Sequence, residues 1–450
     1  MKTVYMVSLG CPKNLVDAEV MLADLERAGY TVAQEAEHAS VILVNTCGFI
    51  RPAVEEAIDT ILELAACKEK NSGQLLVATG CMVQRYGGEL ATELPEVDLF
   101  VGLDDFPRIS TLIDRLGGNS RVVARPGPAA YLMDHRVARR IATPPFRSYL
   151  KITEGCDNRC AYCMIPSIRG RLRSRTIADL AAEAVHLERS GVRELSLIAQ
   201  DLTAYGRDLP EPAALIDLLR ALLEQTNIPW FRLLYLYPAS VTDELLHLMA
   251  REPRLLPYLD IPFQHVSDRV LTAMNRHYRH SALDDLIRRI RTHVPECAIR
   301  TTMLVGFPGE TDEDVTELID ALRIWQLNHV GVFQYQDEDG SPAAQLPDKV
   351  SDEEKESRYQ RVMETQAVIS ERGQQHHVGR LEPVLIEGVS GESNLLLEGR
   401  TRFQAPEIDG CVYITSGHVN PGDIVMVRIT EAHTYDLVGE VADGQGGDKQ

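Results

Sequence analysis

The chain has 450 residues, of which 44% are hydrophobic, and its 46 basic and 66 acidic residues give a formal net charge of −20. That length allows two or three domains with buried cores. The acidity disfavours non-specific nucleic-acid binding, which depends on Lys and Arg neutralising phosphates. No apolar run reaches the ~18–20 residues of a membrane span, and the N-terminus lacks a small-residue cleavage site, so we expect a cytoplasmic protein that does not bind membranes. Nine cysteines in such a chain favour metal ligands or buried thiols over disulfides.

Residues 1–118 alternate short apolar runs with amphipathic segments, which predicts βα units and a parallel sheet. The predicted strands are Val4–Leu9, Val41–Asn45, Leu75–Thr79 and Leu99–Val101, and the predicted helices are Leu15–Ala28, Pro52–Ala66 and Gln84–Leu94. Residues 119–141 are interrupted by Gly and Pro and are rich in arginine, so we expect a linker. Its arginines are Arg121, Arg125, Arg136, Arg139 and Arg140.

A second βα series occupies residues 142–372 and predicts an open, partial (β/α) barrel of six units. Its expected strands are Ser148–Thr153, Glu194–Ala199, Phe231–Leu236, Leu259–Pro262, Ala298–Val305 and Gly331–Tyr335. The polar helix Ser351–His376 is expected to connect it to a last domain. Short strands with Gly-rich turns over residues 376–441 predict a small β-barrel, and the polar, Gly-rich tail 442–450 is expected to be disordered. The predicted barrel strands are Pro383–Gly388, Leu395–Leu397, Val412–Ile414 and Ile424–Glu431.

The loop after the first strand of the second series contains Cys156, Cys160 and Cys163 in a C-x3-C-x2-C spacing. Three thiolates this close together can hold one iron–sulfur cube and leave one iron open to a small molecule. Unrelated buried cysteines or a zinc site are the alternatives, but structural zinc takes four ligands and no partner pair follows. The spacing resembles the signature of the radical S-adenosylmethionine (SAM) superfamily, over roughly residues 142–372. That resemblance implies that SAM binds the open iron and is cleaved to a 5′-deoxyadenosyl radical.

Other candidate residues lie at the carboxyl ends of the barrel strands, where barrel active sites form. For Gln200 and His265 two interpretations stay open: contact with SAM or substrate, or an ordinary polar residue at the end of a strand. Four arginines follow the cluster loop; they are candidates to hold a carboxylate, but a solvated basic face is the more common outcome. The candidates for SAM binding are Gln200, Asp201, His265, Gly306, Gly309 and Glu310, and the arginines are Arg169, Arg171, Arg173 and Arg175.

Three cysteines of the first domain share one placement, just past the carboxyl end of a predicted parallel strand. Cys11 follows the first strand, Cys47 the second and Cys81 the third. These strand ends form one edge of an open α/β sheet, where ligands bind. Each thiol alone is readily explained as a small buried side chain, but the shared placement favours a second cluster. Cys67, Cys297 and Cys411 lack it, and we interpret them as ordinary core or surface residues.

Together, these segments resemble the methylthiotransferase family of radical SAM enzymes over nearly the whole chain. The resemblance implies a flavodoxin-like first domain with one [4Fe–4S] cluster, a radical SAM core with another, and a terminal TRAM barrel. One branch of the family modifies an adenosine beside the tRNA anticodon; the other, the RimO branch, modifies an aspartate of small-subunit ribosomal protein twelve at its β-carbon. Three segments resemble the RimO branch: Ser8–Asn14, Cys163–Pro166 and Tyr235–Pro238.

Charge supports the same branch independently. Residues 376–441 contain four arginines, no lysine and ten acidic residues, a net charge of −6. An acidic barrel is a poor platform for RNA and fits a basic ribosomal protein better. Nucleic acid is therefore not expected as the direct substrate, although a tRNA methylthiotransferase with an atypical barrel is the nearest alternative.

The resemblance also implies the chemistry. The cluster on Cys156, Cys160 and Cys163 generates the radical, which takes hydrogen from the aspartate. The cluster on Cys11, Cys47 and Cys81 delivers sulfur, a second SAM supplies the methyl group, and a reducing partner such as flavodoxin or ferredoxin supplies electrons. Two other classes of protein are alternatives. An iron–sulfur electron carrier would be smaller, and a non-catalytic ribosome-binding factor would not need two open clusters.

Overall fold

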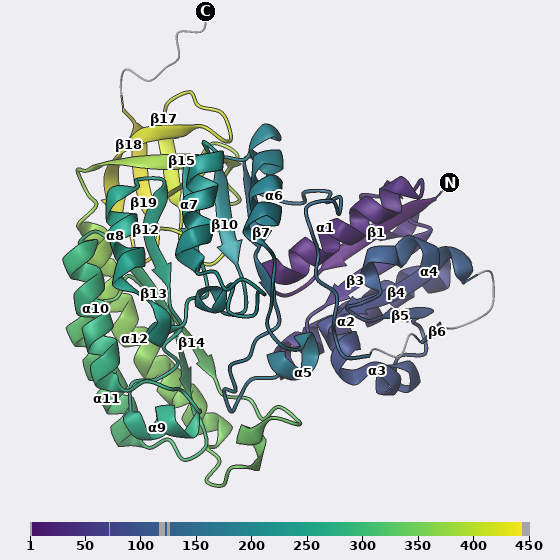
Figure 1. Ribbon diagram of the computed structural model, residues 1–450, viewed down its shortest axis with the longest axis horizontal. Helices are drawn as coiled ribbons and strands as arrows, with labels where there is room; N and C mark the ends of the chain where they lie inside the picture. The colour runs from purple at the N-terminus through teal and green to yellow at the C-terminus, as the bar shows by residue number, and fades with distance from the viewer. Residues whose placement is uncertain (1, 72, 117–121, 124–126, 443–450) are drawn as a thin grey trace, which may run out of the picture.

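The computed structural model describes residues 2–71, 73–116, 122–123 and 127–442, with the backbone alone for 122–123. The first domain is a six-stranded, fully parallel sheet in the order β2-β1-β3-β4-β5-β6 (Figure 1). The order 2-1-3-4-5 is that of flavodoxin-like folds. Its strands are β1 Thr3–Ser8, β2 Thr31–Val32, β3 Val41–Thr46, β4 Leu75–Gly80, β5 Leu99–Val101 and β6 Val122–Val123. Its helices are α1 Pro12–Arg27, α2 Arg51–Lys70, α3 Cys81–Glu93 and α4 Ile109–Arg115.

The second domain is an open, six-stranded parallel sheet in the order β14-β13-β12-β11-β10-β7. A single large apolar cluster joins this sheet to its helices, because both present rows of Leu, Ile and Val to each other. The strands are β7 Arg147–Lys151, β10 Glu194–Ile198, β11 Trp230–Leu233, β12 Leu255–Asp260, β13 Ala298–Val305 and β14 His329–Gln334. The helices are α5 Ile165–Arg169, α6 Ile177–Arg189, α7 Leu215–Gln225, α8 Asp243–Arg251, α9 Asp268–Ala273, α10 His280–His293, α11 Asp312–Trp325 and α12 Asp352–Gln375. Two short antiparallel strands, β8 Thr153–Glu154 and β9 Arg173–Ser174, flank the cluster loop, the loop that contains Cys156, Cys160 and Cys163.

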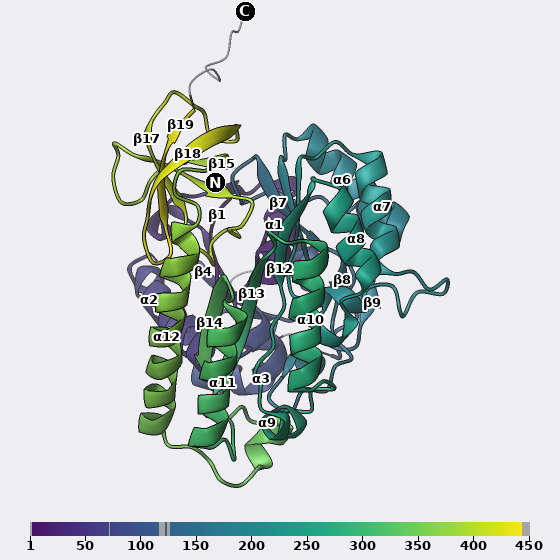
Figure 2. The same cartoon turned by 90° about the vertical axis from the view of Figure 1, so that its left-hand side faces the viewer.

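The third domain is a closed five-stranded barrel in the order β15-β16-β17-β19-β18. Figure 2 shows α12 running beside α11 and leading into this barrel. The strands are β15 Leu381–Val389, β16 Leu397–Thr401, β17 Val412–Ser416, β18 Ile424–Ala432 and β19 Leu437–Val441. The predicted fold class, a parallel α/β domain, an open parallel core and a terminal β-barrel, is confirmed.

The three domains are held together by a shared core and by buried charges. One apolar cluster contains Leu25 of α1, Tyr258 of β12 and Phe403 of the barrel. The barrel also packs near the amino ends of the core strands, where Glu194 accepts hydrogen bonds from Arg232 Nε (2.6 Å) and Arg400 Nη2 (2.5 Å). Because burying an unpaired charge is costly, these pairs constrain how the barrel docks.

The segment expected to be a linker is more structured than its composition predicts. β6 falls inside it and extends the first sheet beside β5. The side chain of Arg139, one of the arginines of the predicted linker, is buried between Glu19 of α1 and Glu183 of α6, and it pairs with both. The linker therefore joins the first two domains through an ion-pair network. Residues 117–121 and 124–126, with Arg121 and Arg125, and the tail residues 443–450 lie outside the described residues.

Candidate active site

The three N-terminal thiols lie on neighbouring loops at the carboxyl edge of the first sheet. We call Cys11, Cys47 and Cys81 the N-terminal triad. A Cβ at Gly10, whose φ is +89°, would lie 3.1 Å from Cys47 Sγ. One at Gly48 would lie 2.7 Å from the carbonyl carbon of Cys81. Glycine at both positions lets the loops approach closely enough for the thiols to converge.

Asn14 joins these three loops through its side-chain amide. Its Nδ2 donates to Leu9 O (3.1 Å) and Thr46 O (3.0 Å), which precede Cys11 and Cys47. Its Oδ1 accepts from Cys81 Sγ at 3.4 Å. Asn14 is 1% exposed, so this bridge is shielded from water. Sequence reasoning did not assign Asn14 a role, and its only signal was its position beside Cys11.

Buried cations surround the N-terminal triad. Burial would raise the pKa of Cys11, but Lys13 and Arg169 hold it below its usual value. Burial raises the pKa of Cys81 to about 12, and Arg169 opposes that rise. The site thus already holds the positive charge that a cluster bound by three thiolates would need. The donor set and its surroundings fit an iron–sulfur cluster.

The second group of thiols, Cys156, Cys160 and Cys163, forms the central triad. The Cys163 N–H donates to Cys160 O (3.1 Å), and the Cys156 N–H donates to Gly170 O (3.1 Å), which folds the loop back on itself. Burial, together with the neighbouring Cys160 and Cys156, raises the pKa of Cys163 to about 12. The three thiols are therefore close enough to influence one another, as ligands of one cluster would be.

A cation also contacts the central triad. Arg276 Nη1 donates to Cys160 Sγ at 3.4 Å, and its Nη2 donates to Pro262 O at 2.7 Å. The guanidinium stacks against Tyr237, 4.6 Å from the ring centroid. Arg276 lies 116 residues from Cys160 along the chain, so sequence reasoning missed it and no local pattern marked it.

The strand-end candidates divide into two groups. Asp201 accepts from Asn158 Nδ2 at 2.7 Å and so anchors the cluster loop. Gln200 Nε2 donates to Glu154 Oε1 at 3.1 Å, whereas Gln200 Oε1 is buried without a partner among the described residues. Both residues lie beside the central triad.

The other four candidates have partners from the outer helices. His265 and Glu310 face each other at 3.4 Å, each with a fully buried side chain. Glu310 Oε1 accepts from Gly306 N (2.9 Å) and from Arg358 of α12 (2.9 Å). A Cβ at Gly306 would lie 2.3 Å from Cγ of Lys355, and Gly309 N–H donates to Asp348 O (2.8 Å). This turn thus packs against α12.

The two triads meet across the domain interface. Cys81 packs in one apolar cluster with Met164 and Ile168, which directly follow the central triad. Arg169 Nη2 donates to Asn14 Oδ1 (2.5 Å) and Asp17 Oδ2 (3.0 Å), and its Nη1 donates to Glu154 Oε1 (2.9 Å). One buried side chain therefore contacts a residue beside each triad.

The prediction of a solvated basic face after the cluster loop is wrong for two of its four arginines. Arg169 and Arg175 are each 2% exposed, because Asp17 and Glu154 pair with the first and Asp179 and Glu183 with the second. The Arg171 side chain is 89% exposed, and Arg173 is partly buried.

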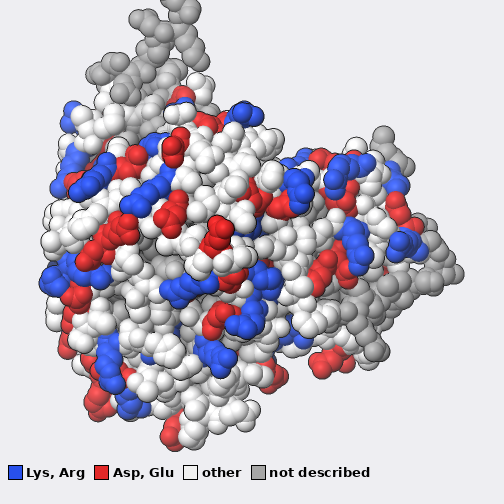
Figure 3. All heavy atoms as spheres, viewed as in Figure 1, with Lys and Arg blue, Asp and Glu red and all other residues white. Residues whose placement is uncertain are grey.

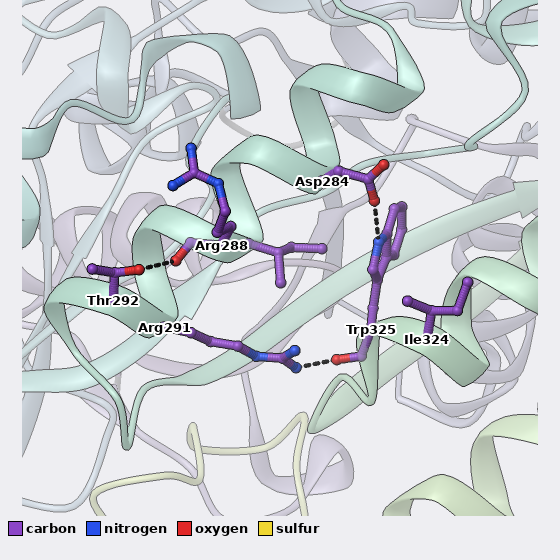
Figure 4. Close-up of a pocket in the computed structure, with 7 residues that line it drawn as sticks. Asp284, Arg288, Arg291, Thr292, Ile324 and Trp325 are labelled. Carbon is purple, nitrogen blue, oxygen red and sulfur yellow. Dashed lines mark hydrogen bonds between the residues drawn. The ribbon is translucent and has the colours of Figure 1, made fainter.

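Two surface pockets differ in their relation to the triads. A pocket of about 300 Å³ lies where the three domains meet and is lined by Cys11, Pro12, Arg147 and Glu407, among others. A larger pocket of about 390 Å³ lies between α10 and α11 (Figure 4). There Trp325 Nε1 donates to Asp284 Oδ1 at 2.7 Å, and its lining contains no predicted site residue. Of these two pockets, only the first adjoins a thiol of either triad, that of Cys11.

Comparisons with known families match each domain. Residues 3–102 match an uncharacterised family, UPF0004; residues 150–322 match the radical SAM superfamily; and residues 378–442 match the TRAM domain. Among solved structures, the radical SAM methyltransferase TsrM of Kitasatospora setae aligns with a TM-score of 0.55 at 16% identity, over 74% of this chain and 72% of that one. This likeness shows a shared fold alone. No helix among the described residues is long and apolar enough to cross a membrane.

Curated relatives match almost end to end. The ribosomal protein uS12 methylthiotransferase RimO of Desulfotalea psychrophila is 52% identical over 437 residues, covering 97% of this chain and 98% of that protein. The protein of the same name from Geobacter sulfurreducens is 47% identical over 97% of this chain and 98% of that protein. The one from Myxococcus xanthus is 48% identical over 98% and 92%.

Proposed function

This chain belongs to the RimO family of ribosomal protein uS12 methylthiotransferases, and we propose that the residue it modifies in uS12 is an aspartate, which gains the methylthio group at its β-carbon. We extend the activity of these relatives to this chain because the sequence identity spans all three domains. One observation supports the proposal most directly. Two partly buried thiol triads, each with an adjacent cation, face one interface and are connected through Asn14 and Arg169.

The radical SAM core implies SAM and one [4Fe–4S] cluster. We propose that the central triad holds that cluster and that the N-terminal triad holds a second one. When bound, these groups supply SAM cleavage to a radical, hydrogen abstraction from the β-carbon, and the sulfur and methyl group of the product. What the chain itself contributes is binding, orientation and exclusion of water.

Several side chains perform those tasks around the central triad. Asp201 fixes the cluster loop through Asn158, and Arg276 donates to Cys160 Sγ and so stabilises negative charge there. Gln200 offers a buried, unpaired oxygen next to the loop. We propose that Gln200 and Asp201 line the SAM site.

For His265, Gly306, Gly309 and Glu310 we propose a supporting role. Their polar groups already contact one another or Arg358, and Gly309 N–H donates to Asp348 O, so they hold the turn after β13 in place. We also propose that a small reducing protein, flavodoxin or ferredoxin, supplies the electrons.

The barrel is proposed to recruit uS12, which is expected to be basic, by charge. The structure reduces the acidic surface that the sequence suggests, because Glu382, Glu387 and Asp409 pair with cations within the chain. On the face in Figure 3, acidic and basic side chains are interspersed. Glu407 is exposed but pairs with Arg147 at 3.1 Å. The exposed acids that remain for recruitment are Glu392, Glu431 and Glu440.

A competition experiment tests the function. Anaerobically reconstituted enzyme is given SAM, a reductant, uS12 and tRNA together, and both substrates are digested and analysed by mass spectrometry. We expect a methylthio mass on one aspartate of uS12 and unmodified tRNA. Methylthio-adenosine in the tRNA digest with unmodified uS12 would contradict the proposal and support the tRNA branch.

A further inference from the structure

Lys13 is a buried cation with no carboxylate partner among the described residues. It is the second residue of α1 and only 7% exposed. Its Nζ lies 3.4 Å from Ala199 O, a long hydrogen bond, and 3.4 Å from the centroid of the Tyr235 ring. A buried ammonium group is normally paired with an anion, because removing it from water unpaired is costly. Among the described residues this site therefore lacks a carboxylate partner for the ammonium group.

The nearby carboxylates do not fill that role. Asp260 Oδ1 pairs with Arg300 (3.1 Å), and its Oδ2 accepts from Tyr235 N (3.1 Å). Glu154 accepts hydrogen bonds from Lys151, Arg169 and Gln200. Both acids influence Lys13 electrostatically, but neither forms an ion pair with it. The opposite charge with the largest influence on Lys13 is that of the Cys11 thiol, so a carboxylate partner for the ammonium group would have to come from outside the described chain.

The position of Lys13 links the two halves of the reaction. It follows Cys11 by two residues, so its backbone belongs to the loop of the N-terminal triad. Its ammonium group reaches the carboxyl ends of β10 and β11 in the radical SAM core. The pocket of about 300 Å³ between the domains is lined by Cys11 and Pro12, the two residues directly before it.

A second unsatisfied group lies next to it. Ala199, whose carbonyl meets the ammonium, is followed by Gln200, and Gln200 Oε1 is buried without a donor. An aspartate within a peptide carries both complements, a side-chain carboxylate and a main-chain N–H. In that residue the β-carbon is bonded directly to the carboxylate carbon.

We propose that the ammonium group of Lys13 binds the side-chain carboxylate of the substrate aspartate and thereby places its β-carbon beside Cys11. This inference rests on the proposed function, since it takes an aspartate as the substrate. Compensation of cluster charge by Lys13 is the competing explanation. Arg169 already provides a cation to the N-terminal triad, held by Asn14, Asp17 and Glu154. The ammonium group of Lys13 also influences Cys11, but its direct contacts are with Ala199 O and the Tyr235 ring of the core.

The test combines wild type and three variants with two substrates. Full-length wild type and Lys13→Met are reconstituted, and each is given uS12 with either the native aspartate or asparagine at the target position. We expect wild type to prefer aspartate on the order of a hundredfold in kcat/KM, because with asparagine the buried ammonium group of Lys13 would lose its carboxylate partner. Lys13→Met should lose most of that preference, and Lys13→Arg should regain part of it. Lys68→Met, at a partly buried lysine paired with Asp98, is the matched control and should keep the preference.

Three results would overturn the proposal. One is wild-type enzyme that uses the asparagine substrate as well as the aspartate substrate, which needs no variant to fold. Another is Lys13→Met that retains the wild-type preference. The third is Lys13→Met that loses the iron of the N-terminal triad, which would assign Lys13 to the cluster. Failure of the proposed function itself is distinguishable, because wild type would then leave every aspartate of native uS12 unmodified.

Discussion

Arg169 provides the sharpest test of how the two thiol triads are held together. Replacing it with Met keeps an unbranched apolar stem of similar length to the aliphatic part of arginine but removes the guanidinium group with its charge and its five donors. Asp17 and Glu154, both buried, would then share only Lys151. The Asn14 bridge to the N-terminal triad would also lose its partner.

The size of the effect follows from burial. Arg169 and its two carboxylate partners all have side chains less than a tenth exposed. Removing one partner of such a network costs about 3–5 kcal/mol, since it leaves uncompensated buried charge. At 1.36 kcal/mol per tenfold change, separation of the first two domains should become roughly 150- to 5,000-fold more populated.

Amide hydrogen exchange on the cluster-free protein measures this directly. Exchange should accelerate in the first turns of α1 and in β8, the two segments that Arg169 joins, while the outer helices of the core exchange as in wild type. Arg171→Met is the matched control: it lies two residues along, is 89% exposed and pairs with Asp157 on the surface. Equal exchange in Arg169→Met and Arg171→Met would refute the reasoning that the buried network holds the interface.

Three further predictions concern the clusters, the barrel dock and the barrel surface. Reconstituted wild type should hold about eight irons per chain, and replacing the three cysteines of either triad with Ala should remove half of them. The variant without the central triad should also form no 5′-deoxyadenosine. If the variant without the N-terminal triad kept all its iron, the second cluster would be excluded. Burial would raise the pKa of Glu194, but Arg400 and Arg232 lower it to about 2. Its stabilisation should therefore be present above about pH 4.5 and disappear as the pH falls toward 2, so the stability difference between wild type and Glu194→Gln should shrink over that range; a constant difference would argue against the ion pair. Neutralising Glu392, Glu431 and Glu440 should slow association with uS12 at low salt and make the association rate less dependent on salt. The control variant neutralises three exposed acids of α2, Glu56, Asp59 and Glu63, and should associate as wild type does. Identical association rates for both variants would exclude the barrel acids as the docking surface.

The architecture and both thiol triads could be predicted from local sequence. The spacing of apolar residues predicts the strands and helices, and the carboxyl ends of parallel strands lie at one edge of the sheet. A cysteine placed just after such a strand is thereby located in space, which is why Cys11, Cys47 and Cys81 could be grouped although they are far apart in the chain.

The charged residues between the domains could not be assigned in this way. Arg139, Arg169 and Arg175 stand in polar, Gly-containing segments that look identical to solvated loops, yet all three are buried. Whether an arginine is solvated or buried depends on the surface that meets it, and here that surface carries Glu19, Asp17 or Glu183 from other segments. Lys13 is a similar case. Its position two residues after Cys11 can be read from the sequence. Its burial against the ends of β10 and β11 without a carboxylate partner depends on how the first domain packs onto the core.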